Sequence, residues 1–265
     1  MKKFFVFLLS VLFLSCSQTQ ETNNSEDTQS AINSKDTQSV RNCEDALLWD
    51  YPVKPGTEDW KQFNSHEEMV NACQIPDDVL VCLSTDKLTD LCLQYPMLLD
   101  IFAFNFLDNG LNQLFISFNG IRELYKRKDA AKSLTDRYME KIQSLSFLEN
   151  DEIEGIEKGK FSVSIWYLDA LMSRIEVQDH ENMEILQEVL RTLISGYEAL
   201  NILNYDGKRS LYEYNFFARA HVIIKICEQC VEEIPNGKGN AVFAPHGANA
   251  ETAEIIDRLS YQLIK

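Results

Sequence analysis

Apolar residues recur at spacings of three and four through most of residues 43–265, and this periodicity constrains the fold more than any other feature. Such residues share one face of an α-helix, whereas a half-buried strand requires strict alternation. The one alternating stretch, residues 161–165, continues into Trp166 and Leu168 at helical spacing. We therefore expect an all-α body, a multi-helix bundle of antiparallel or orthogonal helices or a solenoid-like stack of them. The clearest helical stretches are residues 129–144, 161–176, 181–203, 211–234 and 250–264.

Local signals predict several helix ends. Ser65 followed by Glu68 is typical of a capping box, and Ser84 or Thr85 can cap a helix that ends before Pro96. Residues 108–110 (Asp-Asn-Gly) predict a turn, and residues 119–120 (Asn-Gly) predict the end of the helix that follows it.

The charge balance excludes one class of partner. The chain has 41 acidic and 25 basic residues, a formal charge of −16. Nucleic-acid binding requires a concentrated basic field, so we expect no nucleic-acid partner. Five basic residues do cluster in residues 122–132; phosphate recognition is one interpretation of that cluster, and a solvated helix face is the favoured one.

The amino terminus predicts export. Lys2 and Lys3 precede an apolar run of 11 residues, 4–14, interrupted only by Ser10. A helix of that length is roughly 16 Å long, about half the thickness of a bilayer core, so it is too short to span a membrane. Residues 1–15 are therefore interpreted as a signal peptide.

Residues Phe13-Leu14-Ser15-Cys16 end this run and resemble the lipobox of bacterial lipoprotein precursors, with Phe13 in place of the usual aliphatic residue. The resemblance implies that Cys16 is lipidated, with a diacylglycerol and a further acyl chain such as palmitate, and that the protein is anchored to a membrane of the cell envelope. Ser17, where Asp would retain such a protein at the inner membrane, implies the outer membrane, on its periplasmic or its surface side.

Residues 16–42 predict a disordered linker after the lipidated cysteine. Apolar residues are scarce there, and a polar nonapeptide at 25–33 is repeated at 34–42, so the segment cannot bury enough surface to fold. As a flexible coil it would hold the body roughly 28 Å from the anchor. We expect one helical domain from residue 43 to 265, with two lobes divided near residues 147–159 as the alternative.

Cysteine is the one nucleophilic residue type with a suggestive spacing. Cys227 and Cys230 have the spacing of a redox dithiol or of half a zinc site, but they lie late in an expected helix, where buried apolar cysteines are the favoured interpretation. Besides Cys16 the chain has six cysteines, and their pairing stays open among 15 combinations, alongside the alternative of free buried thiols.

Other catalytic patterns are missing from the sequence. The four histidines, His66, His180, His221 and His246, show no metal-ligand spacing, and no serine lies in a nucleophile elbow. We therefore expect no catalytic residues, no metal and no cofactor. One long irregular stretch, residues 235–249, is typical of a functional loop. Its Phe243, His246 and Asn249 are the candidate recognition patch, with a crossover connection capped by Asn249 as the alternative.

Residues 88–108 and 118–129 are similar to exported proteins of Gram-negative bacteria that remain uncharacterised, and this resemblance implies no activity.

The sequence favours a membrane-tethered helical binding or scaffold protein with a protein or small-molecule partner in the envelope. It favours a protein without enzymatic activity over an enzyme. One alternative is an envelope immunity or inhibitor protein. Loss of residues 1–15 removes two lysines, leaving 23 bases against 41 acids, and this charge of −18 would favour capture of a basic partner. The other alternative is a thiol-dependent enzyme that uses Cys227 and Cys230.

Overall fold

The computed structural model describes residues 43–176, 183–234 and 250–265, which all belong to one compact unit. Every regular element in these ranges is a helix and none is a strand, which confirms the all-α prediction. The elements, with 3-10 helices labelled η, are α1 (Cys43–Leu47), η1 (Trp60–Gln62), α2 (His66–Ala72), α3 (Asp77–Leu80), α4 (Thr85–Leu93), η2 (Leu98–Ala103), α5 (Leu107–Ser117), α6 (Asn119–Leu124), α7 (Ala130–Gln143), α8 (Ser146–Glu149), α9 (Gly155–Met172), α10 (Met183–Ile202), α11 (Lys208–Ile226), η4 (Glu228–Glu232) and α12 (Ala250–Leu263).

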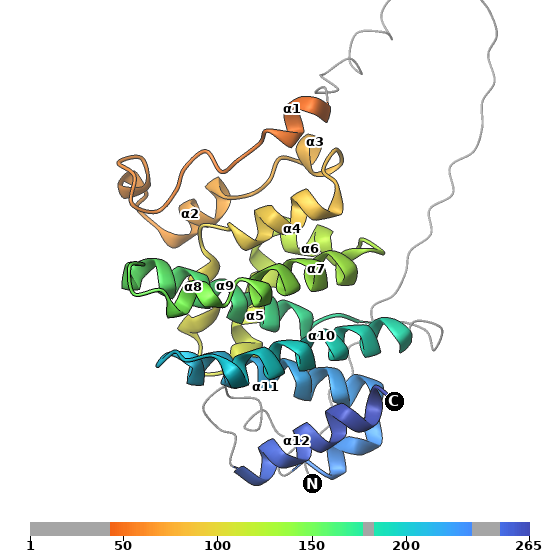
Figure 1. Cartoon of the computed structure of the whole chain (residues 1–265). Coiled ribbons are helices and arrows are strands. Elements are labelled where there is room, and N and C mark those ends of the chain that lie inside the picture. Colours follow the sequence, from red (N-terminus) through yellow and green to blue (C-terminus); the bar gives the residue numbers. More distant parts are fainter. Residues whose placement is uncertain (1–42, 177–182, 235–249) are drawn as a thin grey trace, which may run out of the picture. The chain divides into compact units, whose positions relative to one another are not determined.

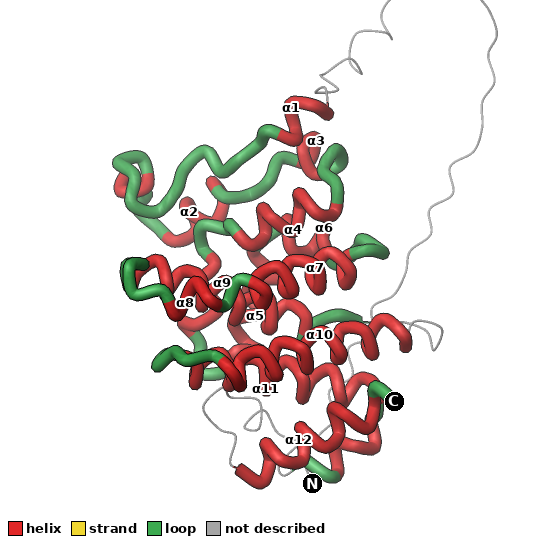
Figure 2. Tube along the Cα trace, viewed as in Figure 1, coloured by secondary structure: helices red, strands yellow, loops and turns green. Residues whose placement is uncertain are grey.

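The longer helices lie side by side (Figure 1), and many of them pack on helices that are not their immediate neighbours in the chain. α4 packs on α6 and α7, α7 packs on α9 and α10, and α11 packs on α9, α10 and α12. Irregular segments are most extensive between α1 and α4, where the helices are short (Figure 2). The pockets described below lie among the central helices.

α10 shows how periodicity produces this packing. Leu186, Val189, Leu190 and Leu193 are completely buried, because their spacing places them on the face that meets the neighbouring helices. The same face carries Gly196, where a Cβ atom would lie 2.2 Å from the hydroxyl of Tyr138 on α7. A side chain at position 196 would therefore push α7 and α10 apart.

The predicted helix caps at Ser65 and Ser84 are confirmed. The Ser65 hydroxyl accepts a hydrogen bond from the backbone N–H of Glu68 at 3.1 Å, and the Ser84 hydroxyl accepts one from Lys87 at 3.2 Å. Each hydroxyl satisfies an N–H group that has no partner within its helix.

The predicted turn at residues 108–110 is wrong, because these residues form the first turn of α5. Gly110 lies inside the helix because the backbone of η2 crosses it closely: a Cβ atom there would lie 2.0 Å from the carbonyl oxygen of Ile101. Asn119 does not end a helix but begins α6. Its side chain donates to the Ile75 carbonyl at 2.6 Å and accepts from the Ile75 N–H at 3.0 Å, so a tertiary contact determines this boundary.

The helix expected over residues 211–234 is also wrong in its extent. α11 begins three residues earlier, at Lys208, and ends at Ile226, and Cys227 has a non-helical backbone (φ −138°, ψ 86°) before η4. The Cys230 N–H donates to the Cys227 carbonyl at 2.9 Å, which is the tighter 3-10 pattern. Because a 3-10 turn places residues i and i+3 directly above one another, it brings the two cysteine side chains together.

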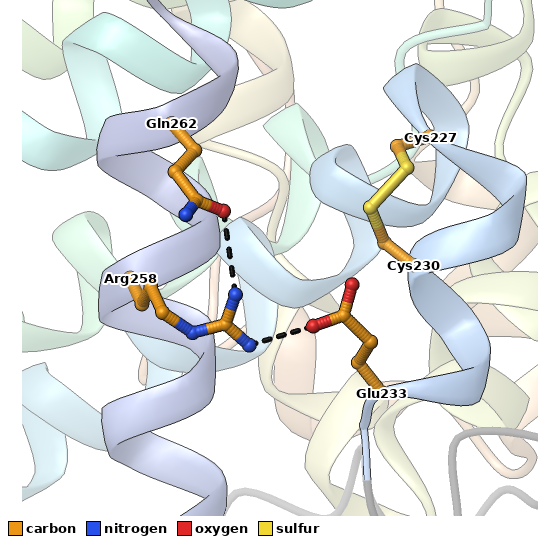
Figure 3. Close-up of a disulfide and its surroundings, with 5 residues drawn as sticks. All are labelled: Cys227, Cys230, Glu233, Arg258 and Gln262. Carbon is orange, nitrogen blue, oxygen red and sulfur yellow. Dashed lines mark hydrogen bonds and ion pairs between the residues drawn. A yellow bond between two sulfur atoms is a disulfide. The ribbon is translucent and has the colours of Figure 1, made fainter.

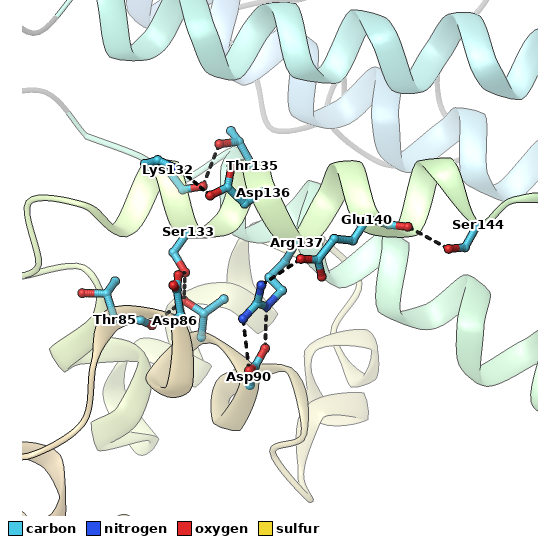
Figure 4. A network of polar contacts seen from close by, with 11 residues as sticks. Thr85, Asp86, Asp90, Lys132, Ser133, Thr135, Asp136, Arg137, Glu140 and Ser144 are labelled. Carbon is cyan, nitrogen blue, oxygen red and sulfur yellow. Dashed lines mark hydrogen bonds and ion pairs between the residues drawn. The ribbon is translucent and has the colours of Figure 1, made fainter. Parts of the chain in front are cut away.

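Polar side chains join α4 to α7 (Figure 4). Arg137 donates to both carboxylate oxygens of Asp90, at 2.6 and 3.2 Å, and Ser133 donates to Asp86 at 2.7 Å. Two-point arginine–carboxylate contacts restrict orientation as well as distance. This seam therefore fixes the register of α4 against α7.

Candidate functional site

Part of the predicted site lies outside the described residues: Cys16, the lipidation site, and Phe243, His246 and Asn249, the recognition patch. For the residues that the structure does describe, none of the helices is long and apolar enough to cross a membrane. The same residues contain no group of three or more side chains that could hold a metal ion.

Cys227 and Cys230 are joined by a disulfide rather than buried as free thiols (Figure 3). The pair follows the carboxyl end of α11, where the helix dipole disfavours a thiolate, whereas reactive thiols lie at helix amino termini. Close by, Glu233 accepts a hydrogen bond from Arg258 of α12 at 2.7 Å. These surroundings support a structural cross-link near the α11–α12 contact and give no support to a thiol-dependent enzyme.

The other described cysteines divide into a second disulfide and two free thiols. Cys43 is bonded to Cys82, which ties α1 to the segment after α3. Cys73 and Cys92 are free and completely buried. Burial raises the pKa of the Cys73 thiol to about 11 and that of Cys92 further, so both are unreactive at neutral pH.

The two described histidines occupy different environments. The exposed His66 ring meets Asp100 at 2.6 Å. His221 is largely buried; its Nδ1 lies 3.0 Å from the Phe217 carbonyl and its Nε2 lies 3.5 Å from Asp108. Burial would raise the pKa of Asp108, but the hydrogen bond from His221 and the nearby positive charges outweigh it and lower that pKa. The two histidines therefore contact different carboxyl groups and form no common site.

Most of the basic cluster at residues 122–132 is used in structural contacts. Arg122 donates to the carbonyls of residues 115 and 116, and Arg127 donates to the carbonyls of residues 80 and 83 and to Glu123. Lys132 pairs with Asp136. A cavity of about 330 Å³ lies beside the cluster and is lined by Arg127, Lys128 and Arg174 together with Glu176. Arg174 is already paired with Asp108. Phosphate recognition has little support from this arrangement.

A different hollow, of about 400 Å³, has the features of a ligand site and is named here the aromatic pocket. Four rings line it: Phe102 and Phe104 from η2 and the segment after it, Trp166 from α9, and Tyr214 from α11. The Trp166 and Tyr214 rings are stacked with centroids 5.1 Å apart. The Phe102 ring stands edge-on to both of them, at 6.1 and 5.7 Å. These ring–ring contacts hold Phe102, Trp166 and Tyr214 in defined orientations.

The polar groups of the aromatic pocket are neutral and unused. Asn105, Ser210 and Tyr214 line it, and their side chains make no hydrogen bond to any described residue. The Trp166 indole N–H is buried, also without a partner in the described ranges. Burial, together with the nearby charge of Glu213, raises the pKa of Tyr214 to about 12, so its hydroxyl stays protonated and able to donate at neutral pH. Ligand pockets typically combine apolar walls with a few such groups.

Close packing of η2 on α5 positions the aromatic pocket. Gly110 allows the approach of Ile101, and the buried Leu107 at the start of α5 holds the segment that carries Phe104 and Asn105. These residues were not predicted as a site from the sequence. A signal was present, because Phe102, Phe104 and Phe106 alternate in a stretch without helical spacing.

Comparisons with known proteins identify no relative of this chain: no family model, curated protein or solved structure matches it.

Proposed function

We propose that this chain is a lipid-anchored binding protein of the bacterial cell envelope, tethered through Cys16 at the outer membrane, with the aromatic pocket as its ligand site. The observation that carries the proposal is the order of signals at the amino terminus: two lysines, an apolar run too short to span a bilayer, and Ser15-Cys16. The anchor must be lipid, because a body with an excess of acids does not bind an anionic membrane by charge.

The disulfides support the exported location. Structural disulfides persist in the periplasm and at cell surfaces and are rare in a reducing cytosol. Cys43–Cys82 and Cys227–Cys230 account for four of the six cysteines besides Cys16. The polar stretch before Cys43 would then act as a spacer between the lipid and the helical body.

The test of anchoring compares the wild type with Cys16→Ala in a Gram-negative host. We expect wild type in the membrane fraction with an acylated amino-terminal cysteine by mass spectrometry, and the variant largely in the soluble fraction. Ser15→Ala is the matched control, since alanine is also small at the cleavage site and should leave the protein in the membrane. An unmodified amino terminus, or a Cys16→Ala form that stays with the membranes, would overturn the proposal.

A further inference from the structure

The aromatic pocket presents two kinds of surface to a ligand, exposed aromatic rings and hydrogen-bonding groups. The Phe104 side chain is 41% exposed, and the Phe102 and Trp166 rings are half-buried, so aromatic surface faces the opening. In most core sites such rings are covered completely. Here a hollow of about 400 Å³ remains in front of them, which is room for a ligand of a few rings or less.

Hydrogen-bonding groups lie around the same hollow. The hydroxyls of Ser210 and Tyr214 each donate and accept, and the amide of Asn105 does both through separate atoms. None of the three is satisfied by another described side chain or carbonyl. They are therefore free to bond to groups on a ligand that carries both donors and acceptors.

The lining excludes several ligand classes by charge. Every residue that lines the aromatic pocket is neutral. A phosphate or carboxylate ligand would lack a cationic partner, and a cationic ligand would lack a carboxylate, although the rings alone could attract a cation. A purely apolar ligand would leave the hydroxyl groups of Ser210 and Tyr214 desolvated and unpaired, which costs binding free energy.

From this combination we propose that the aromatic pocket binds a pyranose ring of a neutral glycan. One face of a pyranose carries C–H groups that pack on an aromatic ring, and its edge carries hydroxyls that bond to Asn105, Ser210 and Tyr214. This inference rests on the proposed binding function and names its ligand class. The glycan would lie against Phe104, the most exposed of the four rings.

The experiment is calorimetric titration of the full-length lipidated protein in a detergent without a sugar head group. Maltotetraose and chitotetraose are the probes, because they share the pyranose ring and differ in the acetamido group. We expect saturable binding of at least one of them. Phe104→Ala and Ser210→Ala should each weaken it about tenfold, the loss of one stacking or hydrogen-bonding contact.

Phe106→Ala is the matched control, since Phe106 is 36% exposed in the same segment but does not line the pocket. It should bind as the wild type does, with an unchanged circular dichroism spectrum in all variants. Three results would overturn the inference: no saturable binding of either oligosaccharide, binding that Phe104→Ala leaves unchanged, or displacement of the sugar by millimolar tetramethylammonium, which would indicate a cation site.

The two proposals fail separately. Absence of sugar binding by a protein that still depends on Cys16 for membrane association would remove the glycan and leave the anchor. Sugar binding by a protein whose membrane association does not depend on Cys16 would remove the lipid anchor and leave the glycan site.

Discussion

At the residue scale, Asp169 is the least expected side chain of the interior, because α9 buries its carboxyl group completely. Neither carboxyl oxygen has a hydrogen-bond partner among the described residues. Loss of water raises the pKa of Asp169 well above its ordinary value, and the nearby Tyr138, Arg219 and Asn215 offset that only in part. Arg219 instead pairs with Asp257 at 2.6 Å. The carboxyl group of Asp169 therefore keeps its proton to a higher pH in the folded protein than in the unfolded chain.

Asp169→Asn is expected to make the protein more stable at neutral pH and to remove part of its pH dependence. In the unfolded chain the carboxyl group ionises near pH 4, while in the folded state it releases its proton only at a higher pH. The folded state then binds more protons, so the free energy of unfolding of the wild type falls as pH rises above about 4. Asparagine does not titrate, so the advantage of the variant should grow as the pH rises above about 4, measured by urea unfolding.

The control for this prediction is Asp151→Asn, because Asp151 is exposed in the turn before α9. It should leave the pH dependence of unfolding as it is in the wild type. Parallel pH profiles for Asp169→Asn and the wild type would show that Asp169 is ionised in the folded protein.

At the scale of elements, cationic side chains stabilise the carboxyl ends of four helices. Arg122 donates to carbonyls at the end of α5. Arg127 donates to the Leu80 carbonyl at the end of α3 and to the Leu83 carbonyl beyond it. Lys208 donates to the Leu203 carbonyl just after α10 at 2.7 Å. Lys225 donates to the Ser173 and Ile175 carbonyls after α9, at 2.9 and 2.8 Å. The last carbonyls of a helix lack intrahelical partners and carry partial negative charge. A cationic side chain there donates hydrogen bonds to these carbonyls and offsets their charge.

Lys225→Met should lower the free energy of unfolding by about 1–3 kcal/mol, since it leaves two largely buried carbonyls and Glu176 without their donor. Methionine keeps the length of the aliphatic side chain. Lys160→Met is the matched control: Lys160 is exposed and contacts only Glu157 in the described ranges, so about 0–1 kcal/mol is expected. Equal losses in the two variants, measured by chemical denaturation, would contradict a capping role for Lys225.

At the scale of the whole molecule, the two disulfides constrain chain segments of very different length. Cys43–Cys82 closes a loop with a sequence separation of 39, and Cys227–Cys230 closes one of 3. Within the closed loop, the Tyr51 hydroxyl also donates to the Leu91 carbonyl at 2.8 Å. The longer cross-link therefore restricts the unfolded chain more, and it holds the short α1 on the body.

Replacing both Cys43 and Cys82 by serine should lower the free energy of unfolding by about 4 kcal/mol on loop entropy alone. The same double replacement at Cys227 and Cys230 should cost about 2 kcal/mol, because the loop is short. Urea unfolding under non-reducing conditions measures both. A larger loss at Cys227 and Cys230 would show that packing against α12, rather than chain entropy, dominates the contribution of that disulfide.

The fold class was predictable from sequence because the burial of one helix face is decided within a few turns. α10 illustrates this, since its buried leucines follow the expected spacing. Errors arose where a distant segment outweighs local preference. Gly110 and Asn119 have typical turn composition, but contacts with Ile101 and Ile75 place both in helices.

The candidate site could not be predicted from the sequence, for a related reason. Phe102, Trp166 and Tyr214 are far apart in the chain, and the alternation of Phe102 with its neighbouring phenylalanines does not indicate which rings they meet. Their rings meet because η2, α9 and α11 pack at one place. The pairing of Cys43 with Cys82 was open for the same reason.

By itself, then, the amino-acid sequence determined that the body is helical and that the chain is acidic, and it predicts a lipidated export signal that remains a proposal. These properties depend on residue type and short-range spacing alone. Only the tertiary structure decided which cysteines are bonded, that Asp169 is buried without a partner, and that four aromatic rings surround a neutral hollow. Such properties depend on which helix faces meet, and that is a result of packing over the whole chain.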